Sequence, residues 1–169
     1  MPNWCEGTFR ARGEKEKIKK FLLEGLDACY GLKITTDIVE DDDSLIVTFK
    51  NPEVDEKDFK NKYHNILYIN NTRRNFIKDL CCGDIYAYKK KSNGEFQFAT
   101  SFKSAWAIET DQYVEIAKQY EIDIRVNGFE CGMEFEQLLE VSRKGQIKCE
   151  SFIQYDDYNW QSPMPLLGG

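Results

Sequence analysis

Metal-free cleavage of RNA needs a base that takes the 2′-hydroxyl proton and an acid that protonates the leaving oxygen. Imidazole is the side chain best poised for both tasks near neutral pH, and the 169-residue chain has one histidine, His64. No spacing signals a Lys or Glu partner for it, or a carboxylate cluster that would hold Mg²⁺. If the chain is an enzyme, we expect a ribonuclease with His64 and Arg74 as catalytic candidates, but the sequence favours a protein that is not an enzyme.

The six cysteines show no metal-binding or cluster-binding spacing. Cys81 and Cys82 are adjacent instead of forming a CxxC knuckle, and His64 has no partner at ligand spacing. We therefore expect no metal and no cofactor. Because no leader precedes the first expected strand, we expect reduced thiols and a location in the host cell cytoplasm. No apolar run approaches the roughly 18 residues of a spanning helix, so no membrane partner is expected.

Charge is unevenly distributed along the chain. Residues 61–91 contain seven basic and two acidic residues, a net of +5. Residues 37–58 contain nine acids and two bases, and residues 109–157 contain twelve acids and five bases, so each of these segments has a net charge of -7. We expect opposite charges to lie on separate faces of the folded protein.

Carboxylate-rich surfaces can pair with the Arg and Lys side chains by which a nucleoprotein enzyme grips its nucleic acid. An alternative stays open at this stage, namely that these acids only solubilise turns and exposed faces. The candidate partner-binding residues are Asp41, Asp42, Asp43, Glu134, Glu136, Asp156, Asp157 and Trp160.

The basic segment predicts the opposite kind of partner. Basic and aromatic side chains at residues 61–91 are suited to holding phosphates and stacking bases, although the sequence pI near 5.0 argues against salt-insensitive binding. A plain exposed strand end is the alternative for the lysine run. The candidate nucleic-acid-binding residues are Arg73, Arg74, Lys78, Lys89, Lys90 and Lys91.

Hydrophobic periodicity predicts the elements that position these residues. Cys5, Phe9 and Ala11 alternate as one buried side of a first strand. Helices are expected at residues 15–30, 72–83 and 110–120, with Gly25 as a point where the first could end early. Further strands are expected at residues 32–39, 44–49, 85–89, 95–102, 122–126, 134–142 and 146–155.

This order predicts one α+β domain over residues 1–158, with residues 51–71 as an irregular insertion and residues 159–169 as an extended tail. The simplest compatible topology is a ferredoxin-like split β-α-β sandwich, with a mainly antiparallel sheet and two main helices on one face. The aromatic residues of the tail suit either docking on a partner or folding back over the sheet, and the sequence does not choose between them.

Met1-Pro2-Asn3-Trp4-Cys5, the 98–106 segment that ends a strand before a helix, and Glu130, Gly132 and Phe135 give the chain a family likeness. It resembles the YubB-type ferredoxin-like proteins of phages and plasmids. It departs from them in having Gly7 where the family usually has asparagine, and in lacking two family elements, a pair of prolines after the tryptophan and a Trp-Gly-Thr-Lys-Trp segment. The resemblance implies an origin on mobile elements and no iron–sulfur centre.

Small proteins of such elements often counteract host nuclease defences. The expected function is therefore inhibition of a host defence nucleoprotein, such as a Cas effector, in the manner of an anti-CRISPR and through acidic surfaces. The alternative is an RNA-binding or guide-RNA-cleaving protein that acts through residues 61–91. A dimeric adaptor with an exposed sheet edge also stays open, and so does the choice between monomer and dimer.

Overall fold

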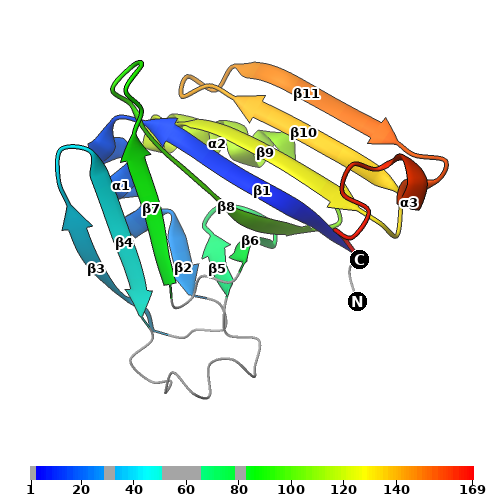
Figure 1. The fold of residues 1–169 in the computed structure, drawn as a ribbon, viewed down its shortest axis with the longest axis horizontal. Helices are drawn as coiled ribbons and strands as arrows, with labels where there is room; N and C mark the ends of the chain where they lie inside the picture. The colour runs from blue at the N-terminus through cyan, green and yellow to red at the C-terminus, as the bar shows by residue number, and fades with distance from the viewer. Residues whose placement is uncertain (1–2, 29–32, 51–65, 79–82) are drawn as a thin grey trace.

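The computed structural model describes residues 3–28, 33–50, 66–78 and 83–169, and this part of the chain is mostly β-structure. Within these residues, eleven strands form one antiparallel sheet, accompanied by three helices (Figure 1). The elements are β1 (Trp4–Gly13), α1 (Lys15–Glu24), β2 (Leu26–Ala28), β3 (Thr35–Glu40), β4 (Ser44–Lys50), β5 (Ile66–Ile69), β6 (Asn75–Lys78), β7 (Gly83–Lys89), β8 (Phe96–Ala105), α2 (Thr110–Tyr120), β9 (Asp123–Glu130), β10 (Phe135–Val141), β11 (Ile147–Gln154) and α3 (Tyr158–Gln161).

The sheet forks at β8. One edge of β8 pairs with β1 along its whole length, and β1 continues the sheet through β9, β10 and β11. The other edge pairs first with β7 at Phe96 and Gln97 and then with β6 at residues 102–104. Two arms therefore leave β8, one made of β7, β4 and β3 and the other of β6, β5 and β2.

Both long helices lie on the same face of the sheet, behind the strands in Figure 1. Phe9 of β1 contacts α1 through Phe21, with ring centroids 5.7 Å apart, and contacts α2 through Tyr113 at 6.4 Å. All three of these rings are buried. The opposite face, which we call the open face, carries Thr8, Arg10 and Arg12 of β1, because successive side chains of a strand alternate between faces.

Strands β1 and β9 approach closely at a pair of glycines. Gly7 lies opposite Gly128 in the antiparallel register. A Cβ atom on Gly7 would lie 2.0 Å from the carbonyl oxygen of Asn127, far inside van der Waals contact. The spacing of these two strands therefore requires glycine at position 7, where the YubB-type family usually has asparagine.

The ferredoxin-like prediction was wrong. A split β-α-β sandwich is a small sheet under two helices, whereas here eleven strands form one forked sheet. The predicted 72–83 helix is also wrong within the described residues, because 75–78 form β6 between β5 and β8. The first helix ends at Glu24, where the Gly25 N–H closes the last turn on Phe21, and residues 26–28 form β2 instead. The 110–120 helix and the hairpins β3–β4 and β10–β11 are confirmed.

The tail folds back instead of extending. Residues 158–161 form the single turn α3, and the Tyr158 side chain is fully buried. Its hydroxyl donates to the carbonyl oxygen of Leu167 at 2.7 Å. The N–H of Gly169 donates to the carbonyl oxygen of Trp4 at 3.1 Å, so the tail returns to the start of β1. Among the described residues, no helix is both long enough and apolar enough to cross a membrane.

Candidate binding surfaces

The predicted nucleic-acid-binding residues do not form one patch. Arg73 and Arg74 precede β6, which pairs with the end of β8, whereas Lys89, Lys90 and Lys91 lie at the turn that leads into β8. Eight residues of extended strand, roughly 27 Å, separate the two groups. The side chain of Lys78 and all of His64 lie outside the described residues, so the roles of His64 and Arg74 as catalytic candidates stay predictions.

Arg74 belongs to an aromatic cluster at one end of the open face. Its guanidinium lies 5.5 Å from the Trp4 ring centroid, and the Lys103 ammonium lies 4.5 Å from it. Phe76 contacts Trp4 edge-on at 5.9 Å and Tyr68 at 5.8 Å. The two cations cover the indole, so this arrangement stabilises the start of β1 more directly than it offers a stacking surface.

The acidic 41–43 turn has a structural role. The Asp41 carboxylate accepts the backbone N–H groups of Asp43 and Ser44 at 2.8 and 2.7 Å, which closes the β3–β4 turn. These hydrogen bonds, that from the Asp43 backbone above all, hold the pKa of Asp41 below its usual value. Asp43 also lies 3.5 Å from the ammonium of Lys89, which the sequence assigned to the opposite charge segment. Asp42 is the third acid of this turn, and its side chain is exposed.

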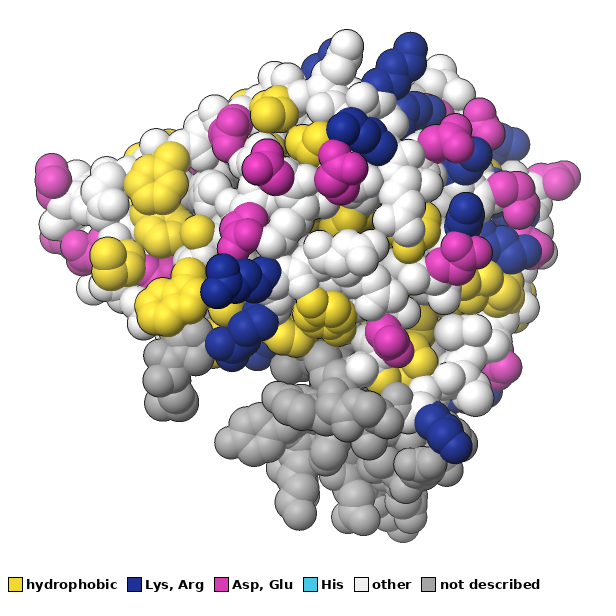
Figure 2. Space-filling view, turned by 180° about the vertical axis from the view of Figure 1, so that it is seen from behind, with side chains coloured by type: hydrophobic (Ala, Val, Ile, Leu, Met, Phe, Trp, Pro, Cys, Tyr) yellow, Lys and Arg dark blue, Asp and Glu magenta, His cyan; other side chains and the backbone are white. Residues whose placement is uncertain are grey.

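The expected sorting of charge onto separate faces does not hold here. The carboxylate of Glu40 lies 3.3 Å from the Lys15 ammonium and 2.7 Å from that of Lys19, and Lys50 pairs with Asp37. Figure 2 shows the helix-covered side of the molecule, on which acidic and basic side chains are interspersed over α1 and the neighbouring hairpin. Residues 37–50 are therefore largely neutralised within the fold.

Glu136 is likewise engaged inside the protein. Its carboxylate accepts the Tyr155 hydroxyl at 2.8 Å and the Asn127 side-chain amide at 3.0 Å. Burial together with the hydrogen bond to Glu136 raises the pKa of Tyr155 to about 12. Glu136 thus holds the start of β10 against the chain that follows β11, and it is not a free contact group.

The other predicted partner-binding residues meet at the C-terminal corner, next to α3 in Figure 1. Backbone hydrogen bonding places them together, because the Tyr155 N–H donates to the Glu134 carbonyl oxygen and the Asp157 carboxylate accepts the Trp160 N–H at the start of α3. The sequence had named these residues singly, and the fold brings them together. We define the C-terminal corner as Met133, Glu134, Asp156, Asp157, Trp160, Met164 and Leu166.

The C-terminal corner is apolar and acidic at once. Trp160 is 87% exposed, Leu166 is 96% exposed and Met133 is 60% exposed. The segments that build it, 129–137 and 153–169, contain five acids and no Lys or Arg. Large apolar side chains exposed together, with acids beside them, are typical of a surface that binds another macromolecule.

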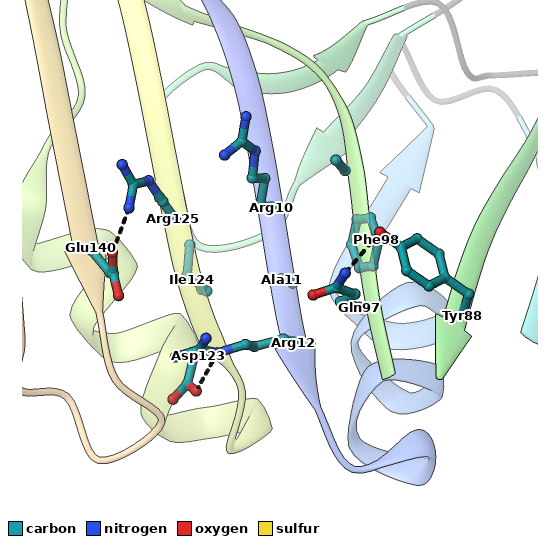
Figure 3. A pocket seen from close by; sticks show the side chains of 11 residues that line it. Arg10, Ala11, Arg12, Tyr88, Gln97, Phe98, Asp123, Ile124, Arg125 and Glu140 are labelled. Carbon is teal, nitrogen blue, oxygen red and sulfur yellow. Dashed lines mark hydrogen bonds and ion pairs between the residues drawn. The ribbon is translucent and has the colours of Figure 1, made fainter. Parts of the chain in front are cut away.

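A second surface, which the sequence reasoning missed, is a hollow of about 470 Å³ on the open face. We call it the arginine groove; its charged and polar lining comes from Arg10, Arg12, Tyr88, Gln97, Asp123, Arg125 and Glu140 (Figure 3). The alternation of β1 already places Arg10 and Arg12 on the face away from Cys5 and Phe9. No sequence signal shows that Arg125 of β9 lies directly across from Arg10.

Two of the three arginines in the groove have carboxylate partners. The Arg12 guanidinium lies 3.0 Å from Asp123, and the Arg125 guanidinium lies 2.9 Å from Glu140. Burial opposes ionisation of Asp123, but hydrogen bonds from Arg143 and from Arg12 outweigh it and lower its pKa to about 2. Within the described residues, the Arg10 side chain has neither an ion pair nor a hydrogen bond, and Figure 3 marks no contact between it and the other lining residues.

Among the described residues, no three His, Cys, Asp or Glu side chains come together as a metal site. The chain matches no protein-family model, no curated protein and no solved structure. Its likeness to the YubB-type family stays a prediction, and the roles of the two surfaces are inferred from their geometry.

Proposed function

We propose that the protein is a mobile-element-encoded inhibitor that docks its C-terminal corner on a basic surface of a host defence nucleoprotein, such as the nucleic-acid groove of a Cas effector. The observation that carries this proposal is Trp160, an 87% exposed tryptophan held on an anchored tail in a corner without Lys or Arg. Binding, not catalysis, is the activity that this arrangement supports.

Trp160 has the properties of an interface anchor. Tryptophan is among the residues most enriched at energetic centres of protein interfaces. The short helix α3, which carries Trp160, is anchored to the protein by Tyr158. The Tyr158 side chain is buried, and its hydroxyl donates to the carbonyl oxygen of Leu167. Because the backbone of α3 is already ordered by these contacts, binding there costs little backbone conformational entropy, and this raises affinity.

The charge of the corner selects a basic partner. Asp156 is exposed, Asp157 is exposed with its carboxylate directed to the α3 N-terminus, and Glu134 lies beside them. Carboxylates in this setting pair with the same Arg and Lys side chains that bind phosphates. The 41–43 turn does not support the proposal, because the Asp41 carboxylate closes the turn and that of Asp43 pairs with Lys89.

The test measures complex formation between the purified protein and a guide-loaded Cas effector of the host, by interferometry and size exclusion. We expect Trp160→Ala to weaken the complex by about 30-fold or more, the loss typical of a central anchor. Asp156→Asn with Asp157→Asn keeps the shape of the corner, and we expect it mainly to slow association and to reduce its salt dependence. Tyr86→Ala and Asp42→Asn, an exposed aromatic and an exposed acid elsewhere, serve as matched controls.

The same mixtures test the alternative function, because the length of the guide RNA is followed in parallel. A stable complex with intact guide RNA supports the inhibitor, and size exclusion then gives the stoichiometry. Shortened guide RNA would support the ribonuclease, and His64→Ala would identify its base. A complex that Trp160→Ala leaves at full affinity would rule out the C-terminal corner as the contact.

A further inference from the structure

The arginine groove is separate from the C-terminal corner and plays no part in the proposed docking. Arg10 of β1 lies opposite Arg125 of β9 on one side and opposite Ala99 of β8 on the other. Like charges directly across an antiparallel pair destabilise it. Figure 3 shows the two guanidinium groups extending in the same direction from neighbouring strands.

Among the described residues, one arginine of the groove has no carboxylate partner. Arg12 is held by Asp123, which Arg143 also contacts at 2.9 Å, and Arg125 is held by Glu140. Arg10 is exposed and has no such partner among the described residues. A guanidinium presents five N–H donors in a planar fork that matches phosphate oxygens. A bound phosphate next to Arg10 would also remove its repulsion with Arg125.

The shape of the groove follows from the fork in the sheet. Strand β7 pairs with β8 only as far as Tyr88 and Gln97 and then diverges from it. After Gln97, the next residue of β8 on the open face is Ala99, which lies opposite Arg10. Because the Ala99 side chain is small, the surface next to Arg10 is recessed. The hollow therefore lies over β8, between the β7 arm and the β1–β9 pair, and is open to solvent.

An aromatic ring lies at the β7 side of this hollow. Tyr88 is 54% exposed, and its hydroxyl accepts the Gln97 amide at 2.7 Å, which fixes the ring at the edge of the groove. Two inter-strand steps, roughly 10 Å, separate the backbone of β7 from that of β1. Lys90 and Lys91, both exposed, lie in the turn just beyond Tyr88.

We infer that the arginine groove binds a short single-stranded nucleic acid, with a phosphate held by Arg10 and a base stacked on Tyr88. Single strands are bound in this way, by a cationic track with an aromatic stacking platform and without sequence readout. The phosphate contact differs from the predicted 73–91 set, because Arg10 comes from β1. It stands independently of the docking at the C-terminal corner.

Fluorescence anisotropy with a labelled 12-nucleotide oligouridylate, and with oligothymidylate of the same length, tests the inference on the full chain. We expect Arg10→Gln to raise Kd about ten-fold, as loss of a charge-assisted contact does. Tyr88→Ala should raise it about five-fold or more, whereas Tyr88→Phe retains the ring and the affinity. Arg73→Gln removes the same charge from the other end of β8 and should leave Kd within about two-fold.

Salt dependence gives a second readout. One phosphate contact at the unpaired cation should weaken single-strand binding about 2.6-fold between 50 and 200 mM salt, and Arg10→Gln should remove most of that dependence. Equal losses in Arg10→Gln and Arg73→Gln would move the site to the 73–91 set and overturn the inference. Unchanged affinity in Arg10→Gln, no binding by the wild type, or complete competition by millimolar inorganic phosphate would also overturn it.

Discussion

Replacing Asp123 with asparagine tests the ionic network at the edge of the arginine groove. The Asp123 carboxylate accepts the backbone N–H of Arg143 at 2.8 Å, the Arg143 side chain at 2.9 and 3.2 Å, and the Arg12 Nε at 3.0 Å. Its side chain is only 17% exposed. Asparagine has the same shape but no charge, so the substitution removes the ionic part of these contacts.

The expected loss follows from the pKa of Asp123. A value lowered from 3.8 to about 2 in the folded state corresponds to roughly 2 kcal/mol of stability. Because the folded-state pKa is depressed, this contribution is fully present above about pH 4 and disappears as pH falls toward 2. Asp123→Asn should therefore lower the free energy of unfolding by about 2 kcal/mol at pH 7 and by progressively less below pH 4.

Urea unfolding followed by tryptophan fluorescence at pH 7, 5, 4, 3 and 2.5 measures both proteins. Asp42→Asn in the exposed β3–β4 turn is the control, and we expect it to stay within about 0.5 kcal/mol of the wild type. If the difference between wild type and Asp123→Asn is constant from pH 7 to pH 2.5, the reasoning about this network is refuted.

Three further substitutions or reactions probe the fold. The buried carboxylate of Glu130 accepts two backbone N–H groups of the β9–β10 turn. In urea unfolding, Glu130→Ala should lower the free energy of unfolding by about 3 kcal/mol. A loss below about 1 kcal/mol would contradict that role. Gly7→Asn, which introduces the residue usual in the YubB-type family, should lower stability by about 3 kcal/mol or more, whereas Gly94→Asn in an open turn should cost under about 1. Burial above all raises the pKa of Cys5 to about 12; mass spectrometry should show it alkylated by iodoacetamide at pH 8 only after unfolding, and modification in the native protein would count against its burial.

The elements that the sequence predicted correctly have one strong periodicity and clear ends. The 110–120 helix has its apolar residues on one stripe, of which Tyr113, Ile116 and Tyr120 are buried in the core. The β3–β4 and β10–β11 hairpins have alternating strands around polar turns. In these segments local preference and tertiary packing agree, so the sequence was sufficient.

Where the local preference of a segment is ambiguous, strand pairing determined its secondary structure. Phe76 and Ile77 suit a helix stripe as well as a strand, and the strand forms because its backbone pairs with β5 on one side and β8 on the other. The ferredoxin-like prediction failed for the same reason. The sheet forks at β8 because different residues of β8 form backbone hydrogen bonds with β6 and with β7. Such pairing leaves no periodic pattern in the sequence.

By itself, the sequence determined which side chains face the core in β1 and α2, and it named Trp160, Asp156 and Asp157 as contact candidates. Only the tertiary structure decided which charges stay available: it paired most of the acidic 37–43 residues with lysines, and it placed Arg10 opposite Arg125 without a carboxylate. The physical reason is that burial follows local periodicity, whereas ion pairing depends on distances of a few ångströms between residues remote in the chain.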